Sequence, residues 1–135
     1  MIAVDTNVLL RHLYQHDDAR QSQLANGIVA DATAAGSSIF VSSIVLVETV
    51  WVLRQGYRID RAGLLRVLDA LSDESNVVLE HAPHVRGGID AFRRGRADFA
   101  DHLLGRIARE AGARTTYTFD RGLRGVDGFT WVGSR

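Results

Sequence analysis

Acidic residues occupy positions in this chain where carboxylates could act together in catalysis. Asp5 ends a short apolar run near the N-terminus, and Glu48 lies inside the largely apolar segment SSIVLVETVWVL. Asp98 and Asp101 share the string ADFADHL, and Asp120 closes TTYTFDR. Carboxylates at the carboxyl ends of predicted strands, with one more inside a helix, suggest a common pocket for a hard cation. Such a pocket indicates metal-assisted chemistry on a phosphate ester.

Each acid also has a purely structural explanation. Asp5 and Asp120 precede predicted helices, where an aspartate commonly caps the helix N-terminus. Asp98 can cap a further helix, and Asp101 in its first turn suits the helix dipole. Glu48 is harder to explain in this way, because apolar neighbours nearly all round it predict a buried helix. A buried glutamate needs a partner, a proton or a metal.

Taken together, the acids favour a metal site. Two like charges about 4 Å apart repel by about 1 kcal/mol in water and about 4 kcal/mol at an intermediate dielectric. Three or four converging carboxylates would be unstable unless a divalent ion neutralised them. Ligation by oxygen atoms favours Mg²⁺ or Mn²⁺ over zinc, and the chain has no cysteine.

Composition sets the limits of the interpretation. A chain of 135 residues suits one domain, so we expect a single domain over residues 1–135. The formal net charge is zero, and all 16 basic residues are arginines, which excludes a P-loop lysine or a Schiff base. No apolar stretch is long enough for a membrane span. The start MIAVDTN lacks the features of a secretory signal, so we expect a cytoplasmic location.

The hydrophobic pattern predicts strands that alternate with helices. Ser42 or Ser43 is the expected N-cap of one helix and Gly56 its end. This alternation predicts an α/β fold whose central parallel sheet of four to five strands lies between helices. Ligands of such sheets bind beyond the carboxyl ends of the strands, where Asp5 and Asp120 fall. The expected strands are 2–4, 39–41, 76–79, 115–119 and 129–132, and the expected helices are 6–13, 17–35, 43–55, 60–71, 83–93, 98–111 and 121–123.

The strings DTNVLLR, VLVETVWVLR, ADFADHL and TFDR together resemble the PIN-domain family, and more narrowly the VapC toxins of bacterial toxin–antitoxin modules. Each string is weak alone, but four in the same order within one short domain are specific. The resemblance extends from Ile2 to beyond Asp120. It implies a metal-dependent endoribonuclease that hydrolyses RNA phosphodiester bonds with a metal-activated water.

The resemblance also assigns roles to the acids. The first acidic position of the family falls on Asp5, the second on Glu48 and the fourth on Asp120. The third is ambiguous, because both Asp98 and Asp101 are available. We favour Asp101, which directly precedes the helical pattern HLLGRIA. Asp98 is then an additional ligand or holds a metal-bound water.

Basic and histidine residues near these acids have less distinctive patterns. Arg93, Arg94 and Arg96 precede ADFAD, so they either contact an RNA backbone or form a solvated helix end. His81 and His84 flank a proline, which makes a regular metal-binding pair on one helix face improbable. We expect them in a solvated loop.

The resemblance implies partners as well as a substrate. A cognate VapB-like antitoxin would block the pocket, and the family forms homodimers. The leucine-rich segment Asp60–Leu71 could supply part of a dimer interface or simply face the core. Two alternatives remain open: a housekeeping PIN nuclease in RNA maturation or DNA processing, and a catalytically silent PIN-fold binding module.

Overall fold

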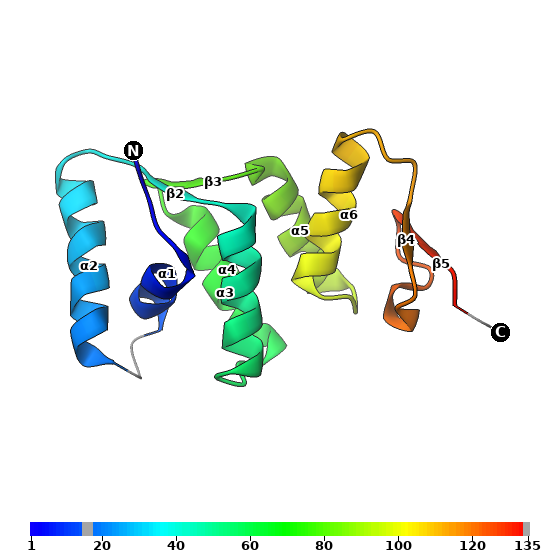
Figure 1. The fold of residues 1–135 in the computed structure, drawn as a ribbon, viewed down its shortest axis with the longest axis horizontal. Helices are drawn as coiled ribbons and strands as arrows, with labels where there is room; N and C mark the ends of the chain where they lie inside the picture. The colour runs from blue at the N-terminus through cyan, green and yellow to red at the C-terminus, as the bar shows by residue number, and fades with distance from the viewer. Residues whose placement is uncertain (15–17, 134–135) are drawn as a thin grey trace. The chain divides into compact units, whose positions relative to one another are not determined.

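The computed structural model describes residues 1–14 and 18–133, and the chain divides into two compact units (Figure 1). The first unit is Met1–Glu80 and the second is His81–Arg135. Each unit is described by itself below. The single domain expected from the sequence stays a prediction.

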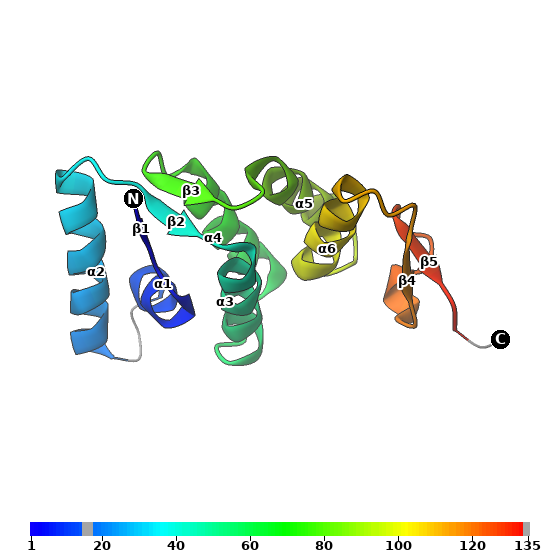
Figure 2. The same cartoon turned by 45° about the horizontal axis from the view of Figure 1, so that its top comes forward.

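The first unit is a three-stranded parallel sheet with four helices. Its strand order is β1-β2-β3, and Figure 2 shows these strands side by side. Ile39 of β2 pairs with Ile2 on one side and with Val77 on the other. The elements are β1 (Ile2–Ala3), α1 (Thr6–Leu13), α2 (Ala19–Ala34), β2 (Ile39–Val41), α3 (Ser43–Gln55), α4 (Arg61–Asp73) and β3 (Val77–Leu79).

Side-chain caps explain where the helices of this unit begin. Ser42 Oγ accepts a hydrogen bond from the Val45 N–H at 3.2 Å and starts α3, which ends at Gly56 as the sequence predicted. Asp60 caps α4 in the same way through the Gly63 N–H at 2.8 Å. Such caps satisfy N–H groups that have no partner within the helix. The expected start of α2 at residue 17 lies outside the described residues.

The second unit pairs two helices with a two-stranded parallel sheet. Helices α5 and α6 pack along one another, as Figures 1 and 2 both show. The strand order is β4-β5, with Thr116 opposite Phe129 and Thr118 opposite Trp131. The elements are α5 (Ala82–Arg94), α6 (Phe99–Glu110), β4 (Thr116–Thr118), the short 3₁₀ helix η1 (Arg121–Leu123) and β5 (Phe129–Trp131).

Each unit has its own apolar contacts. In the first unit Leu64, Leu68 and Leu71 of α4 are buried, so the leucines of this helix serve mainly the core. In the second unit Phe92 of α5 and Phe99 of α6 are buried and meet edge to face, with their ring centroids 6.4 Å apart. The predicted homodimer stays a prediction.

The α/β class predicted from the sequence is confirmed. All five expected strands form, but they divide into a sheet of three and a sheet of two instead of one larger sheet. Strands β1, β3 and β5 are each one residue shorter than expected, and β4 is two residues shorter. No helix among the described residues is long and apolar enough to cross a membrane.

Candidate carboxylate site

Asp5 lies directly between the first strand and the first helix. Its Oδ1 accepts a hydrogen bond of 3.0 Å from the Val8 N–H, so it is the N-cap of α1. The side chain is exposed. This bond engages one of the two carboxylate oxygens. The capping role and a role in ligation are therefore compatible.

Glu48 lies on the exposed face of α3, so the expectation that its side chain is buried was wrong. The buried residues of this helix are Leu46, Thr49, Val50 and Leu53, which fall on one stripe at spacings of three and four. With about 100° of rotation per residue, Glu48 faces away from that stripe. The apolar side chains on its own face, Ile44 and Trp51, are exposed too. Their apolar character suggested that this face of α3 is buried, whereas it is exposed.

The elements that carry Asp5 and Glu48 start at the same edge of the first sheet. Strands β1 and β2 are parallel, so α1 and α3 both begin at its carboxyl edge, and these helices contact one another. Glu80 follows β3 at this edge, and its Oε1 accepts a hydrogen bond from the Ser43 N–H at 2.9 Å. The sequence analysis missed Glu80. Its place directly after a predicted strand was the available signal.

In the second unit, the loop before α6 and the segment around η1 line an open cleft of about 500 Å³. Three of the predicted acids, Asp98, Asp101 and Asp120, lie in its wall. The wall mixes charges of both signs with small and apolar side chains: Arg96, Ala97, Asp98, Asp101, Asp120, Arg121, Gly122, Leu123, Arg124, Gly125 and Val126.

Local hydrogen bonds fix the orientation of Asp120 in this cleft. Its Oδ1 accepts a bond of 2.8 Å from the Gly122 N–H, which makes it the N-cap of η1. Its own N–H donates to Thr118 Oγ1 at 3.0 Å. The carboxylate therefore projects from a tight turn at the carboxyl end of β4. The sequence analysis expected Asp120 at this position, beyond the carboxyl end of a parallel strand.

Asp98 and Asp101 lie one helical turn apart at the start of α6. Asp98 is the N-cap residue of this helix, but its side chain makes no capping hydrogen bond. Asp101 lies in the first turn, and its side chain is half-buried whereas that of Asp98 is exposed. Asp98 thus occupies the expected N-cap position without the expected capping bond.

The carboxylates of the cleft do not form a complete metal-binding site by themselves. Among the described residues, no group of three or more acidic or histidine side chains is arranged to hold a metal ion. The donors in the cleft are nevertheless carboxylate oxygens, the chemistry that magnesium and manganese prefer. This donor set fits an ion that takes part of its coordination from water or substrate.

Of the three arginines that the sequence offers as candidates for RNA contact, Arg96 lines the cleft and the other two do not. Arg93 and Arg94 lie in the last turn of α5, where positive charge also suits the helix dipole. Arg121 and Arg124 were not singled out in the sequence analysis, and both line the cleft beside Asp120.

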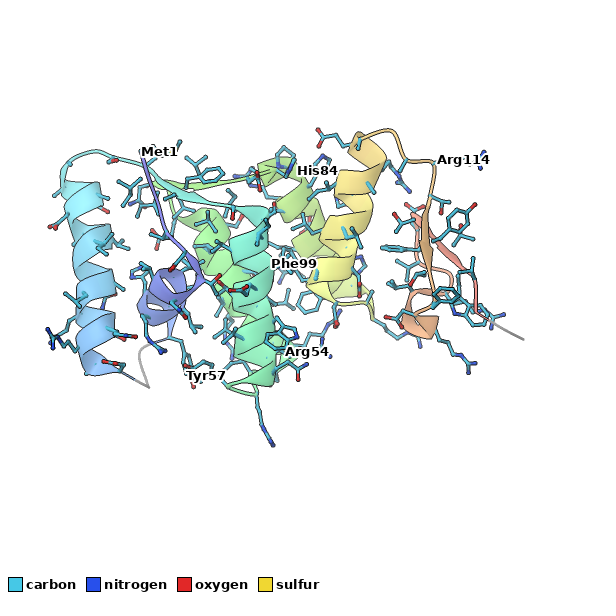
Figure 3. The ribbon with its side chains drawn as sticks, in the orientation of Figure 1. Met1, Arg54, Tyr57, His84, Phe99 and Arg114 are labelled. Atoms are coloured by element: carbon cyan, nitrogen blue, oxygen red, sulfur yellow. The ribbon has the colours of Figure 1, made fainter. Side chains whose placement is uncertain are left out.

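The two histidines expected in a solvated loop lie instead at the start of α5, where Figure 3 labels His84. His84 Nε2 lies 2.7 Å from Glu110 Oε2 of α6, and His81 Nδ1 lies 3.7 Å from the same oxygen. His81 adopts a left-handed conformation with φ 54°. This cluster ties the start of α5 to the end of α6.

Comparison with known proteins identifies the family. The family model of the PIN domain matches residues 2–128 of the chain. The chain belongs to the PIN domain family. The matched range contains every acid of the predicted set, from Asp5 to Asp120, and covers most of both units of this PIN domain.

A curated relative of this PIN domain is similar over most of its length. The chain is 24% identical over 121 residues to the VapC ribonuclease of Aquifex aeolicus (strain VF5), which covers 90% of this chain and 88% of that relative. The resemblance to VapC proteins that the sequence motifs indicated is therefore confirmed.

Proposed function

We propose that this PIN domain is a metal-dependent endoribonuclease and the toxin of a VapBC-type toxin–antitoxin module. The observation on which this rests is the cleft that Asp98, Asp101 and Asp120 line together in a member of this family. The similarity to a VapC ribonuclease supports RNA as the substrate.

Mg²⁺ or Mn²⁺ is the proposed cofactor. Mg²⁺ in proteins keeps several waters and is held by one or two carboxylates together with substrate phosphates. Asp101 and Asp120 are the proposed ligands in the cleft, with Asp98 as an auxiliary, and the sequence resemblance adds Asp5 and Glu48 to the catalytic set. The ion would neutralise charge on the substrate phosphate and lower the pKa of a water for attack.

The residues of the chain supply orientation and charge. The bond from the Gly122 N–H holds one oxygen of Asp120 in place, so the carboxylate does not have to be ordered when substrate binds. Positive side chains in the cleft wall, including Arg96, offset the repulsion between carboxylates and RNA phosphates. We expect no covalent intermediate with the protein.

Cleavage of an RNA pool by the purified full chain tests this proposal. We expect cuts with Mg²⁺ or Mn²⁺, none with EDTA, and cleavage at least about 100-fold slower with Asp120→Asn. The matched control is Asp90→Asn, which removes an exposed carboxylate of α5 that does not line the cleft and should cleave like the wild type. Cleavage by Asp120→Asn at the wild-type rate, or a folded, antitoxin-free protein that cuts nothing with either metal, would contradict the proposal.

The proposed partners follow from the toxin assignment. The gene of a VapB-like antitoxin should lie next to the gene of this chain, and both proteins should act in the cytoplasm. The co-purified antitoxin should suppress the cleavage of RNA by this chain. If RNA is cleaved but no antitoxin gene lies adjacent, the housekeeping nuclease is the better description. Light scattering of the purified chain tests the homodimer.

A further inference from the structure

Two arginines in the wall of the cleft share one aromatic ring. The guanidinium carbon of Arg124 lies 5.0 Å from the centroid of the Trp131 ring, and that of Arg121 lies 5.8 Å from it. Both distances are within the range of cation–π attraction. The ring belongs to β5, whereas the arginines belong to η1 and the residue after it.

The Trp131 ring is itself held by the backbone. Its Nε1–H donates a hydrogen bond of 3.3 Å to the carbonyl oxygen of Phe119, the residue before Asp120. Trp131 also pairs with Thr118 in the parallel ladder of β4 and β5. The ring therefore restricts the two arginine side chains to positions beside Asp120, and an ordered guanidinium loses less entropy when it binds a ligand.

Within the described part of the chain, no carboxylate neutralises the charge of either arginine. There, neither Arg121 nor Arg124 forms an ion pair, although carboxylates line the same cleft. Arg109 of the same unit shows the contrast, since its guanidinium makes two hydrogen bonds to Asp127. Neither guanidinium donates a hydrogen bond to a described residue, so the N–H donors of both are available for an anion.

We propose that Arg121 and Arg124, ordered by Trp131, bind backbone phosphates of the RNA strand beside the phosphate that is cleaved. This rests on the proposed function and adds the residues that hold its substrate. The three aspartates in the cleft wall repel a polyanion, and the arginines beside them counter that repulsion. Contacts to phosphates fix the position of the strand and carry no sequence information, so these arginines should bind RNA of any sequence.

Binding of a fluorescein-labelled single-stranded RNA to the full chain tests the proposal, in EDTA so that no strand is cut. Anisotropy is measured over a series of salt concentrations for Arg121→Ala, Arg124→Ala and the double variant. Each lost phosphate contact should weaken binding and flatten the slope of log K against log salt by about 0.7, and the double variant by about 1.4.

Arg114→Ala is the matched control. Arg114 is an exposed arginine of the same unit (Figure 3). It precedes β4, whereas Arg121 follows that strand. It does not line the cleft. Its replacement should leave both the affinity and the salt slope at the wild-type values. If Arg114→Ala and Arg121→Ala changed RNA binding equally, the effect would come from the net charge of the protein and not from a contact in the cleft. That result would overturn the proposal.

Two replacements at Trp131 test whether the ring positions the arginines. Trp131→Phe keeps an aromatic face and should retain most of the RNA affinity, whereas Trp131→Ala should approach the double arginine variant. Circular dichroism melting of both variants checks that they fold. Equal RNA affinity of a folded Trp131→Ala and the wild type would remove the positioning role.

The outcomes separate this proposal from the proposed function. If the wild type cleaves RNA, the arginine variants should raise KM and leave kcat nearly unchanged, because they lose ground-state and transition-state binding alike. Normal cleavage, KM and salt slope in the double variant would overturn the arginine proposal and leave the nuclease standing. If the salt slope depends on the arginines but the wild type cleaves no RNA, the arginine contacts stand and the nuclease proposal falls.

Discussion

The carboxylate of Glu80 caps a helix from a neighbouring strand, because its Oε1 accepts a hydrogen bond of 2.9 Å from the backbone N–H of Ser43. Glu80 follows β3, and Ser43 opens α3, which follows β2. The Glu80 N–H donates in turn to the carbonyl oxygen of Val41 at 3.0 Å. These bonds continue the pairing of β2 and β3 beyond the last residues of the strands.

We predict that Glu80→Ala lowers the free energy of unfolding by about 1 kcal/mol, the usual cost of losing a helix cap. Glu80→Gln keeps an oxygen that can accept the bond and should lose less than half as much. Urea unfolding followed by circular dichroism measures both values. Equal losses in the two variants would mean that the bond to Ser43 does not stabilise the fold.

Replacing the capping aspartates by asparagine should separate stability from catalysis. Asparagine caps helices about as well as aspartate, so Asp5→Asn and Asp120→Asn should unfold at nearly the wild-type urea concentration. Both should cleave RNA at least about 100-fold more slowly, because the amide carries no charge to hold a metal. Alanine at either position should lose activity together with about 1 kcal/mol of stability. Asparagine variants that cleave normally would leave these acids a capping role only.

Gly105 of α6 lies against the ring of Phe129 in β5. A Cβ at this position would come within 2.9 Å of a ring carbon, and Gly105 is buried. Gly105→Ala should therefore destabilise the protein by about 1–3 kcal/mol through overpacking, despite the better helix propensity of alanine.

Gly87→Ala in α5 is the matched comparison for Gly105→Ala. There the three heavy atoms nearest to the added Cβ all belong to the guanidinium of the exposed Arg106, which can move away. Without overpacking, the helix propensity of alanine should leave stability unchanged or raise it by up to about 1 kcal/mol. Thermal melting of both variants makes the comparison, and a destabilised Gly87→Ala would show that Arg106 is held in place.

The pair formed by Arg109 and Asp127 should respond to acid and to salt. Two hydrogen bonds from Arg109, at 3.2 and 3.3 Å, and then its charge, lower the pKa of Asp127. Because the pKa is lowered in the folded state, the pair stabilises the protein at pH values above the ordinary pKa of an aspartate. This stabilisation is lost as the pH falls through the lowered pKa. In Arg109→Ala, carbon-13 NMR titration should show the Asp127 pKa rise. In the wild type, 1 M salt should move it in the same direction, because both side chains are exposed. A salt-independent pKa would contradict this account.

Much of the fold could be predicted because its signals are local. Ser42 and Gly56 gave the limits of α3, and Asp60 gave the start of α4, since capping depends on residues within one helical turn. The acids at strand ends were found for the same reason. Asp5 and Asp120 each follow a strand and begin a helical segment.

The features that the sequence did not predict depend on contacts between distant residues or on the direction of a side chain. Apolar neighbours made Glu48 look buried, because a short pattern did not show which face of α3 meets the core. Arg121 and Arg124 meet Trp131 only after β5 pairs with β4. Glu80 and Ser43 are far apart in the sequence and meet through the parallel pairing of their strands.

The connection from β4 to β5, residues 119–128, is short for two parallel strands, which usually need a longer crossover with an α-helix. Gly125 and Gly128 make it possible by adopting φ values of 79° and 90°. Asp120, Arg121 and Arg124 all belong to this connection. An insertion or deletion here would shift the aspartate relative to the arginines and the strand pairing together. Evolution can therefore exchange residues in this segment more readily than it can change its length.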